Sequence, residues 1–397
     1  MRFLFIEQSA LWPVNSGHKQ LMASFIEGLS EMGHTVDLFI LDRVFNEPQK
    51  AKEWEKFGGK IFYHSLQMDY GKVPAFLLKW GNRLFGDEHF LVETASLERY
   101  KKALNLVCKA ENYDTVFCNF VYNFPLISAV PSTIKTLLME YNHQSQIEID
   151  LANKLQLSPI MRVFYRNQAE RLKQYERKAH QEAKRVLYIS KEDQKVFIGV
   201  DQSSDVFYPP MKPATLRKTD FSFKNALLYS SDLSRNVNRD SLMWFLAQVW
   251  EELKAKFPQL TLYVTGNAPE SLKSWAKGYH GVEFTGFLSE VKLEELAVNC
   301  DAFIAPIFSG SGIKIKILWA MSLGLPVVTT PKGAEGIEIV PGKDFELADN
   351  PNLFYKKLRN LLEDDHLRKK YAESGKSIIE MKYSEVKSLK YFLEISA

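Results

Sequence analysis

Short apolar runs alternate with amphipathic helical stretches along almost the whole sequence. The first such unit is an apolar run at 2–6, a stretch with apolar residues at helical spacing at 16–32, and a second apolar run at 35–41. Strands that alternate with helices form parallel sheets, because each crossover helix lies on one face of the sheet. The pattern therefore predicts an α/β fold of the doubly wound kind.

A proline-rich segment divides this pattern into two series. Three prolines within 206–220 interrupt every periodic pattern, which is typical of a linker. We therefore predict a first Rossmann-like domain at 1–205, a linker at 206–220, and a second Rossmann-like domain at 221–380. The final helix, at 381–397, has no sheet of its own domain left to cover, and one candidate position for it is on the first domain.

Composition excludes several classes of protein. The chain has 397 residues and a formal net charge of +3, which is too small to favour nucleic acid as a partner. Cys108, Cys118 and Cys300 have neither the even number of a disulfide framework nor the spacing of a zinc site. No run of ~18 consecutive apolar residues occurs. We therefore expect a cytoplasmic protein without a membrane span and without a metal site.

A turn of glycines and serines precedes a helix predicted at 313–323. Lys314 and Lys316 fall in the first turn of that helix, where the positive end of the helix dipole repels cations, and no Asp or Glu is present to compensate. Gly310 and Gly312 allow a ligand to approach the backbone closely. The pattern predicts a site for the phosphate or diphosphate of a nucleotide. The alternative is that both lysines are ordinary solvated residues.

The segment 310–336 carries a resemblance to a known family. It reads GSGIKIKILWAMSLGLPVVTTPKGAEG and resembles the signature of the retaining glycosyltransferases of family 4, also called group 1, at all but one informative position. Weaker similarities are PVNSGHKQ at 13–20, MEYNHQSQIE at 139–148, SKED at 190–193 and VEFTGFLSE at 282–290. The resemblance covers nearly all of the chain. It implies the GT-B fold, in which two Rossmann-like domains face a cleft.

The resemblance also implies an activity. Members of this family transfer a sugar from a nucleotide diphosphate sugar to an acceptor, with retention of the anomeric configuration and without a metal or another cofactor. We expect UDP as the carrier, a hexose as the sugar, and a glycan, lipid-linked or protein acceptor in the synthesis of a bacterial surface polysaccharide or glycoconjugate. The sequence contains no Asp-x-Asp motif, so protein groups would have to neutralise the diphosphate.

The lysines of the glycine turn, positions that match the motifs of the family, and a loop after the strand predicted at 226–229 that would open onto the cleft supply the candidate site residues. Lys314 and Lys316 are the candidate catalytic clamp for the leaving diphosphate, and His143 is the candidate contact to the reacting sugar. Further candidates for donor binding are Ser16, Gly17, Arg235, Arg239, Gly310, Ser311, Gly312 and Ile313. Each has a structural alternative: His143 as a buried structural histidine, Ser16 as a helix cap, and the two arginines as surface charge.

One position departs from the family motif. Relatives carry a Glu before Ala-Met on this helix, which accepts hydrogen bonds from the ribose of the nucleotide, whereas this chain has Trp319. An indole has one N–H donor and no acceptor, so Trp319 can only stack on a ring, lie over a cation or pack in the core. Glu335 or Glu338 could supply the missing carboxylate. The alternative function is a catalytically silent partner subunit that binds acceptor or nucleotide without turnover.

Two further readings concern the first half of the chain. The segment 73–86 combines large apolar residues with Lys79 and Arg83 beside Trp80, which is typical of a helix on an anionic membrane surface. The alternative is an ordinary helix packed under the first sheet. A nicotinamide-dependent oxidoreductase is disfavoured, because the turn after the first strand reads EQSALWPVNSG and lacks the Gly-x-Gly-x-x-Gly pattern.

Overall fold

The structure, a computed structural model, describes residues 1–7, 11, 17–41, 58–63, 94–153, 158–310 and 312–397. It divides into two compact units. One unit contains Met1–Val14, His18–Tyr208 and Leu389–Ala397, and the other contains Asn15–Gly17 and Pro209–Ser388. The chain thus enters the second unit within the segment that the prolines mark as a linker.

The first unit is built on a parallel sheet of seven strands. In spatial order the strands are β3 (Ile61–Tyr63), β2 (Thr35–Ile40), β1 (Arg2–Glu7), β4 (Thr115–Asn119), β5 (Lys135–Glu140), β6 (Val186–Tyr188) and β7 (Ser204–Val206). All neighbouring strands run parallel. The five residues 3–7 of β1 are all buried, as expected for a strand that is covered on both faces.

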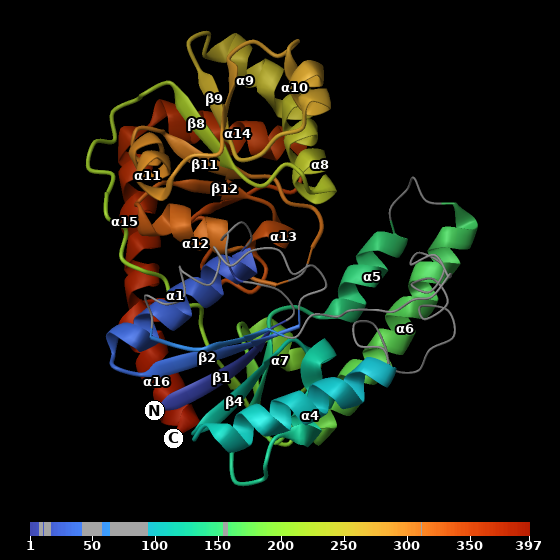
Figure 1. The fold of residues 1–397 in the computed structure, drawn as a ribbon. Coiled ribbons are helices and arrows are strands. Elements are labelled where there is room, and N and C mark those ends of the chain that lie inside the picture. Colours follow the sequence, from blue (N-terminus) through green and yellow to red (C-terminus); the bar gives the residue numbers. More distant parts are fainter. Residues whose placement is uncertain (8–10, 12–16, 42–57, 64–93, 154–157, 311) are drawn as a thin grey trace. The chain divides into compact units, whose positions relative to one another are not determined.

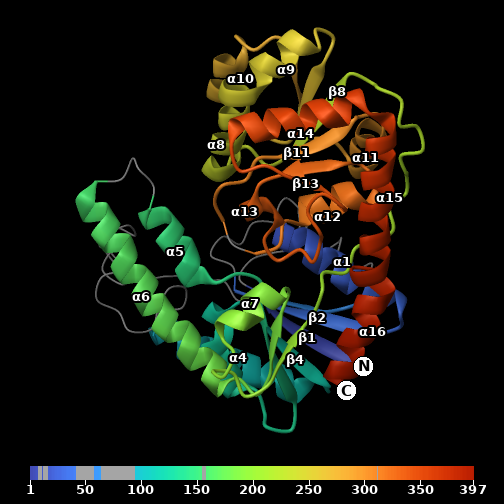
Figure 2. The same cartoon turned by 180° about the vertical axis from the view of Figure 1, so that it is seen from behind.

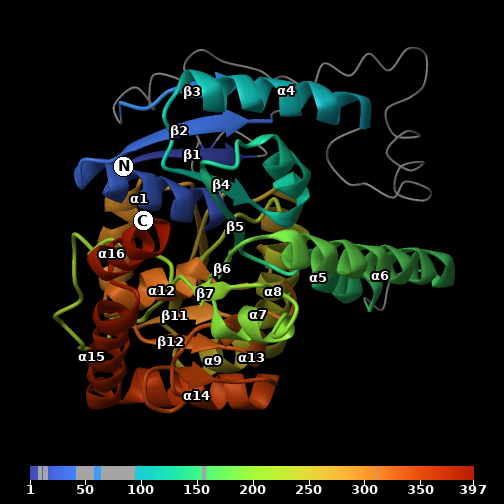
Figure 3. The same ribbon diagram turned by 90° about the horizontal axis from the view of Figure 1, so that it is seen from below.

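Helices cover both faces of this sheet. Phe5 of β1 stacks on Phe25 of α1 (Gly17–Glu31) with ring centroids 5.6 Å apart. Leu4 and Ile6, which point to the opposite face, share a buried cluster with Leu104 of α4 (Thr94–Ala110). Figure 3 shows α1 and α4 on opposite sides of β1 and β2. This alternation confirms the predicted doubly wound α/β architecture.

Two further helices of the first unit pack side by side. They are α5 (Gln144–Ala152) and α6 (Pro159–Glu182), which extend together away from the sheet (Figure 1). Ser158 caps α6 by accepting a hydrogen bond from the Met161 N–H, and Pro159 occupies the first helical position. The unit also contains the 3-10 helix η1 (Val121–Ala129) and α7 (Lys191–Val196).

The last helix, α16 (Glu385–Ser396), ends in the first unit. Its Phe392 is fully buried, with ring centroids 4.3 Å from Phe25 and 4.7 Å from Phe117. The Thr115 hydroxyl also donates to the Ser396 carbonyl at 3.2 Å. An aromatic side chain in this position anchors the C-terminal helix to the core of the first unit.

The second unit is built on a parallel sheet of six strands. In spatial order they are β10 (Val282–Gly286), β9 (Thr261–Thr265), β8 (Ala226–Ser230), β11 (Ala302–Ala305), β12 (Val327–Thr329) and β13 (Glu346–Leu347). The helices are α8 (Asn236–Phe245), continued by a π-helical turn at Leu246–Trp250, α9 (Glu251–Lys256), α10 (Glu270–Ala276), α11 (Glu290–Val298), α12 (Ile315–Ser322), α13 (Pro331–Ala334), α14 (Pro351–Glu363) and α15 (Asp365–Lys382).

The core cluster of this unit joins its sheet to several helices, among them α14. Phe354 and Leu358 of α14 are fully buried and share a cluster with Val328 of β12. Figure 2 shows α14 lying across β11 and β13. Asn350 caps this helix by accepting from the Leu353 N–H at 2.9 Å. The second sheet is therefore also of the predicted doubly wound type.

Candidate nucleotide site

The glycine turn before α12 has the backbone geometry that glycine favours. Gly310 has φ 98° and Gly312 has φ 76°, and side chains other than glycine are disfavoured at such angles. The positive φ of Gly312 turns the chain before the helix, so α12 begins at Ile315 rather than at the predicted residue 313. Lys314 therefore caps the helix with φ −92° and ψ 86°, instead of lying inside its first turn. Ser311 lies outside the described residues, and Ile313 is buried.

Lys314 folds back over this turn. Its Nζ donates to the Gly310 carbonyl at 3.2 Å and to the Gly312 carbonyl at 2.5 Å. The side chain is half-buried. These bonds stabilise the backbone of the glycine turn. They also hold the positive charge of Lys314 beside the turn, where it could attract an anion.

Lys316, the second residue of α12, extends to the loop and helix that follow β8. Its Nζ donates to Ser231 Oγ at 2.5 Å and lies 3.3 Å from Asn238 Oδ1. The ammonium also lies 6.0 Å from the centroid of the Tyr229 ring. Ser231 directly follows β8, and Asn238 is in the first turn of α8. The ammonium of Lys316, on α12, thus lies at the carboxyl end of β8. The carboxyl ends of strands are where ligands bind to open α/β sheets.

The charge of Lys316 has no acidic counterion within the described residues, since both hydrogen-bond partners are neutral. Burial, with smaller contributions from the positive charges of Lys314 and Arg235, lowers the pKa of Lys316 to about 7. A half-buried cation of this kind is unfavourable until an anion reaches it. The arrangement is therefore suited to an anionic ligand.

Close packing of two loops fixes the position of Ser231. The Ser231 N–H donates to the Thr265 carbonyl at 3.1 Å. Gly266 has φ 110°, and a Cβ there would lie 2.0 Å from the Ser231 carbonyl oxygen. Sequence reasoning missed Ser231 and Asn238. Both follow β8, and the carboxyl end of each parallel strand is the signal that could have found them.

The two candidate arginines differ in their surroundings. Arg239 is half-buried and donates to the Leu233 carbonyl at 3.2 Å, to the Ser234 carbonyl at 2.7 Å and to Asn236. Arg239 therefore braces the loop between β8 and α8. Arg235 precedes α8 and is exposed, and its charge acts on Lys316.

Trp319 packs inside the second unit. The residue is 9% exposed, and its ring meets Phe303 of β11 edge to face with centroids 6.2 Å apart. Edge-to-face contact with a fully buried phenylalanine is typical of core packing. The structure thus describes Trp319 in the arrangement of the core alternative, and it places no carboxylate at this position of α12.

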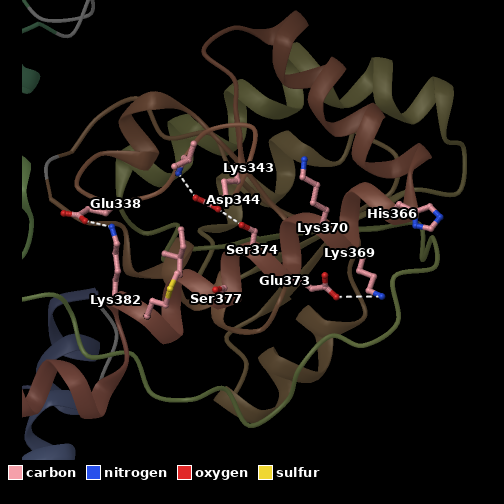
Figure 4. A pocket seen from close by; sticks show the side chains of 13 residues that line it. Glu338, Lys343, Asp344, His366, Lys369, Lys370, Glu373, Ser374, Ser377 and Lys382 are labelled. Atoms are coloured by element: carbon pink, nitrogen blue, oxygen red, sulfur yellow. Dashed lines mark hydrogen bonds and ion pairs between the residues drawn. The ribbon is translucent and has the colours of Figure 1, made fainter.

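Glu335 and Glu338, the candidate replacements for the missing carboxylate, are both engaged elsewhere in the second unit. Glu335 follows α13 and lies 2.8 Å from Lys332 Nζ. Glu338 Oε2 lies 2.5 Å from Lys382 Nζ of α15. Glu338 and Lys382 also line a surface pocket of about 710 Å³, in which Figure 4 shows their side chains pointing toward each other.

His143, the candidate from the first unit, follows β5 and is 9% exposed. Its Nε2 lies 3.2 Å from Asp193 Oδ1, and its ring lies 5.0 Å from that of Phe197. Burial alone would lower the pKa of His143, but the hydrogen bond and negative charge of Asp193 raise the pKa overall. Asp193 is in the SKED segment, where it also accepts from the Ser190 hydroxyl at 2.5 Å.

Ser16 and the segment 73–86 lie outside the described residues, and Gly17 is the first residue of α1. In the described part of the chain, no group of three or more His, Cys, Asp or Glu side chains is arranged to hold a metal ion. No helix among the described residues is both long and apolar enough to cross a membrane.

The part of the chain that carries Lys316 matches a known family model. Residues 224–364, which contain Ser231, Asn238 and Lys316, match the family described as glycosyl transferases group 1. The chain is 23% identical to an uncharacterised 44.6 kDa protein in the cps region of Klebsiella pneumoniae, over 97% of each chain.

Solved structures agree in fold over the full length. A sucrose-phosphate synthase from Thermosynechococcus elongatus superposes with a TM-score of 0.72 at 13% identity, covering 100% of this chain and 98% of the other. HepE from Anabaena, in complex with UDP and glucose, gives 0.65 at 16% identity, covering 100% of this chain and 99% of the other. Residues 224–364 therefore match the group 1 glycosyl transferase family, and the two units of the chain have the GT-B fold.

Proposed function

We propose that this protein transfers a hexose from a nucleotide diphosphate sugar, with UDP as the carrier, to a glycan, lipid-linked or protein acceptor. The observation that carries the proposal is the half-buried ammonium of Lys316, whose two hydrogen-bond partners are neutral. Negative charge develops on the leaving diphosphate during transfer, and a fixed cation in a partly dry site stabilises that charge strongly. Lys316 would supply this stabilisation without a metal and without another cofactor.

The relatives support the donor and the biological setting. HepE from Anabaena was solved with UDP and glucose, and the Klebsiella pneumoniae relative is a protein of the cps region. We infer transfer with retention of configuration in the synthesis of a bacterial surface polysaccharide or glycoconjugate. We place the reaction in the cytoplasm, in keeping with three cysteines that are all free and buried. Membrane contact through 73–86 is part of the proposal, although that segment lies outside the described residues.

Nucleotide binding is the first test of this function. The thermal unfolding midpoint should rise with one nucleotide sugar in a panel of UDP, GDP, ADP and CMP forms, because only a ligand that binds the native state stabilises it by mass action. A panel in which no member raises the midpoint of the wild-type protein would contradict the proposal.

Replacement of the clamp is the second test. We expect Lys316→Ala to lower kcat/KM by about 100-fold or more, the usual loss when a group that stabilises transition-state charge is removed. The matched control is Lys292→Ala on α11, which removes an exposed lysine from the same unit and should leave turnover unchanged. Equal turnover in Lys316→Ala and Lys292→Ala would remove Lys316 from the mechanism.

The alternative function is a silent GT-B partner subunit that binds acceptor or nucleotide without turnover. Trp319 favours this alternative, because its indole replaces a carboxylate that the family motif carries and is buried against Phe303. Release of free nucleotide from a sugar donor by the purified wild-type protein would reject it. Nucleotide binding without any release, with and without acceptor present, would support it.

A further inference from the structure

The surroundings of Lys316 combine neutral hydrogen-bond acceptors with positive charge. Ser231 Oγ and Asn238 Oδ1 accept from its ammonium, and the face of the Tyr229 ring lies on another side. The charged groups that act on it are Lys314, from the preceding turn, and Arg235, from the start of α8. No Asp or Glu of the described residues contacts it.

The orientation of the Asn238 amide is fixed by its other contact. Asn238 Nδ2 donates to the Asp232 carbonyl at 2.7 Å, and a carbonyl oxygen can only accept. Oδ1 must therefore face Lys316. The Tyr229 hydroxyl donates to the Asn238 backbone carbonyl at 2.7 Å, which fixes the backbone of this residue as well.

We propose that Ser231 and Asn238 are positioning residues that hold Lys316 without a counterion, so that binding of a diphosphate ligand is coupled to uptake of one proton by Lys316. This inference rests on the proposed function, since it concerns the same site. The proton leaves a hydronium ion or the acid form of the buffer, whose bond to that proton breaks, and forms an N–H bond at Nζ, while no bond of the ligand changes. The neutral oxygen of Asn238 orients the ammonium without neutralising its charge, so that charge remains available to attract the diphosphate.

The pH dependence follows from this arrangement. With a pKa of about 7, Lys316 is mostly neutral at pH 8 in the unliganded protein. A bound diphosphate favours the charged form and raises that pKa, so binding takes up a proton above pH 7. Affinity is then highest near pH 7 and falls as the pH rises, until the pKa of the bound state is reached.

Calorimetric titration with UDP between pH 7 and 9 tests the coupling of UDP binding to proton uptake. The phosphates of UDP do not titrate in this range, because their last ionisation has a pKa of about 6. We expect the affinity of the wild-type protein to fall by up to about tenfold per pH unit, the limit for one proton. We also expect the measured enthalpy at pH 8 to depend on the ionisation enthalpy of the buffer, because a proton is taken up.

Two substitutions of the same residue separate charge from structure. Asn238→Asp and Asn238→Ala both lose the bond to the Asp232 carbonyl, but only Asn238→Asp places a carboxylate beside Lys316. Asn238→Asp should bind UDP about tenfold more weakly at pH 7 and show less than about a twofold change up to pH 9, because the ammonium stays charged. Asn238→Ala should keep the steep dependence of the wild type. Ser234→Asp, an exposed position of the same loop, is the control for added charge and should also keep it.

The outcomes distinguish this inference from the proposed function. UDP binding by the wild type with a flat pH profile, or a steep profile in Asn238→Asp, overturns the coupling but leaves the nucleotide site in place. Absence of UDP binding at every pH, together with no response to any nucleotide sugar, overturns both.

Discussion

Replacement of Gly266 by alanine should destabilise the second unit and disturb Lys316 at the same time. Gly266 follows β9 with φ 110°, and an alanine Cβ would lie 2.0 Å from the carbonyl oxygen and 2.8 Å from the carbonyl carbon of Ser231. Both atoms belong to the backbone, so they cannot rotate away as a flexible side chain would. The loop after β8 must therefore move by more than about 1 Å to reach ordinary contact distance.

The magnitude combines two effects. An L-residue at positive φ costs about 1–2 kcal/mol. Displacement of Ser231 strains or breaks its N–H bond to the Thr265 carbonyl, which contributes about 1 kcal/mol, and repacking of the loops adds a similar amount. We expect a loss of about 3–4 kcal/mol in the free energy of unfolding. For a unit of this size that corresponds to a fall of roughly 10 °C in the thermal midpoint.

The assay is scanning calorimetry with Gly342→Ala as the matched control. Gly342 is in the same unit and has φ 76°, but nothing lies within 4 Å of a Cβ built there. The control therefore reports backbone strain alone, about 1 kcal/mol. Equal midpoints for the two variants would refute the argument that the Ser231 backbone blocks a side chain at 266. Gly266→Ala should also weaken UDP binding, since Ser231 orients Lys316.

Two predictions concern the first unit. Phe392→Ala should lower the free energy of unfolding, measured by urea denaturation, by about 3–5 kcal/mol, because it leaves a cavity beside Phe25 and Phe117. Val386→Ala on the same helix is the control, since Val386 is 56% exposed, and it should cost less than about 1 kcal/mol. Burial lowers the pKa of His180 to about 4, so between pH 6.5 and 4 this histidine binds a proton in the unfolded chain but not in the folded chain. The free energy of unfolding should therefore fall over this range by at most about 1.4 kcal/mol per pH unit. His180→Gln should reduce that fall, as measured by thermal midpoints across the same pH range.

The strands were predictable from sequence because parallel strands are buried on both faces. The predicted runs at 2–6 and 35–41 became β1 and β2 with shifts of one residue at one end. Helix α5 was not predicted, because its stability comes from partners distant in sequence. Its first turn is capped by Glu176 of α6, which accepts from the Gln144 N–H at 2.6 Å and from the Ser145 hydroxyl at 2.5 Å. No periodicity within α5 reports such a contact.

The candidate site was predictable only in part, for a related reason. The lysines of the GSG turn were found because a cation at a helix start is unusual. The different orientations of Lys314 and Lys316 depend on the positive φ of Gly312 and on Ser231, which is 85 residues from Lys316 in the chain. Orientation of a long side chain is decided by partners that a single sequence does not place.

Trp319 and Lys316 together bear on how the proposed nucleotide ligand would be held at a position where the chain departs from the motif it resembles. Position 319 is one turn after Lys316 on α12, a spacing at which side chains are neighbours, so the carboxylate of the motif would lie near the ammonium. Trp319 removes that negative charge and packs against Phe303 instead. For the nucleotide ligand that we propose, the ribose would lack that acceptor, whereas the attraction of Lys316 for the diphosphate would be greater. Because the two changes act on different parts of the ligand, we expect diphosphate affinity to persist while discrimination at the ribose hydroxyls weakens.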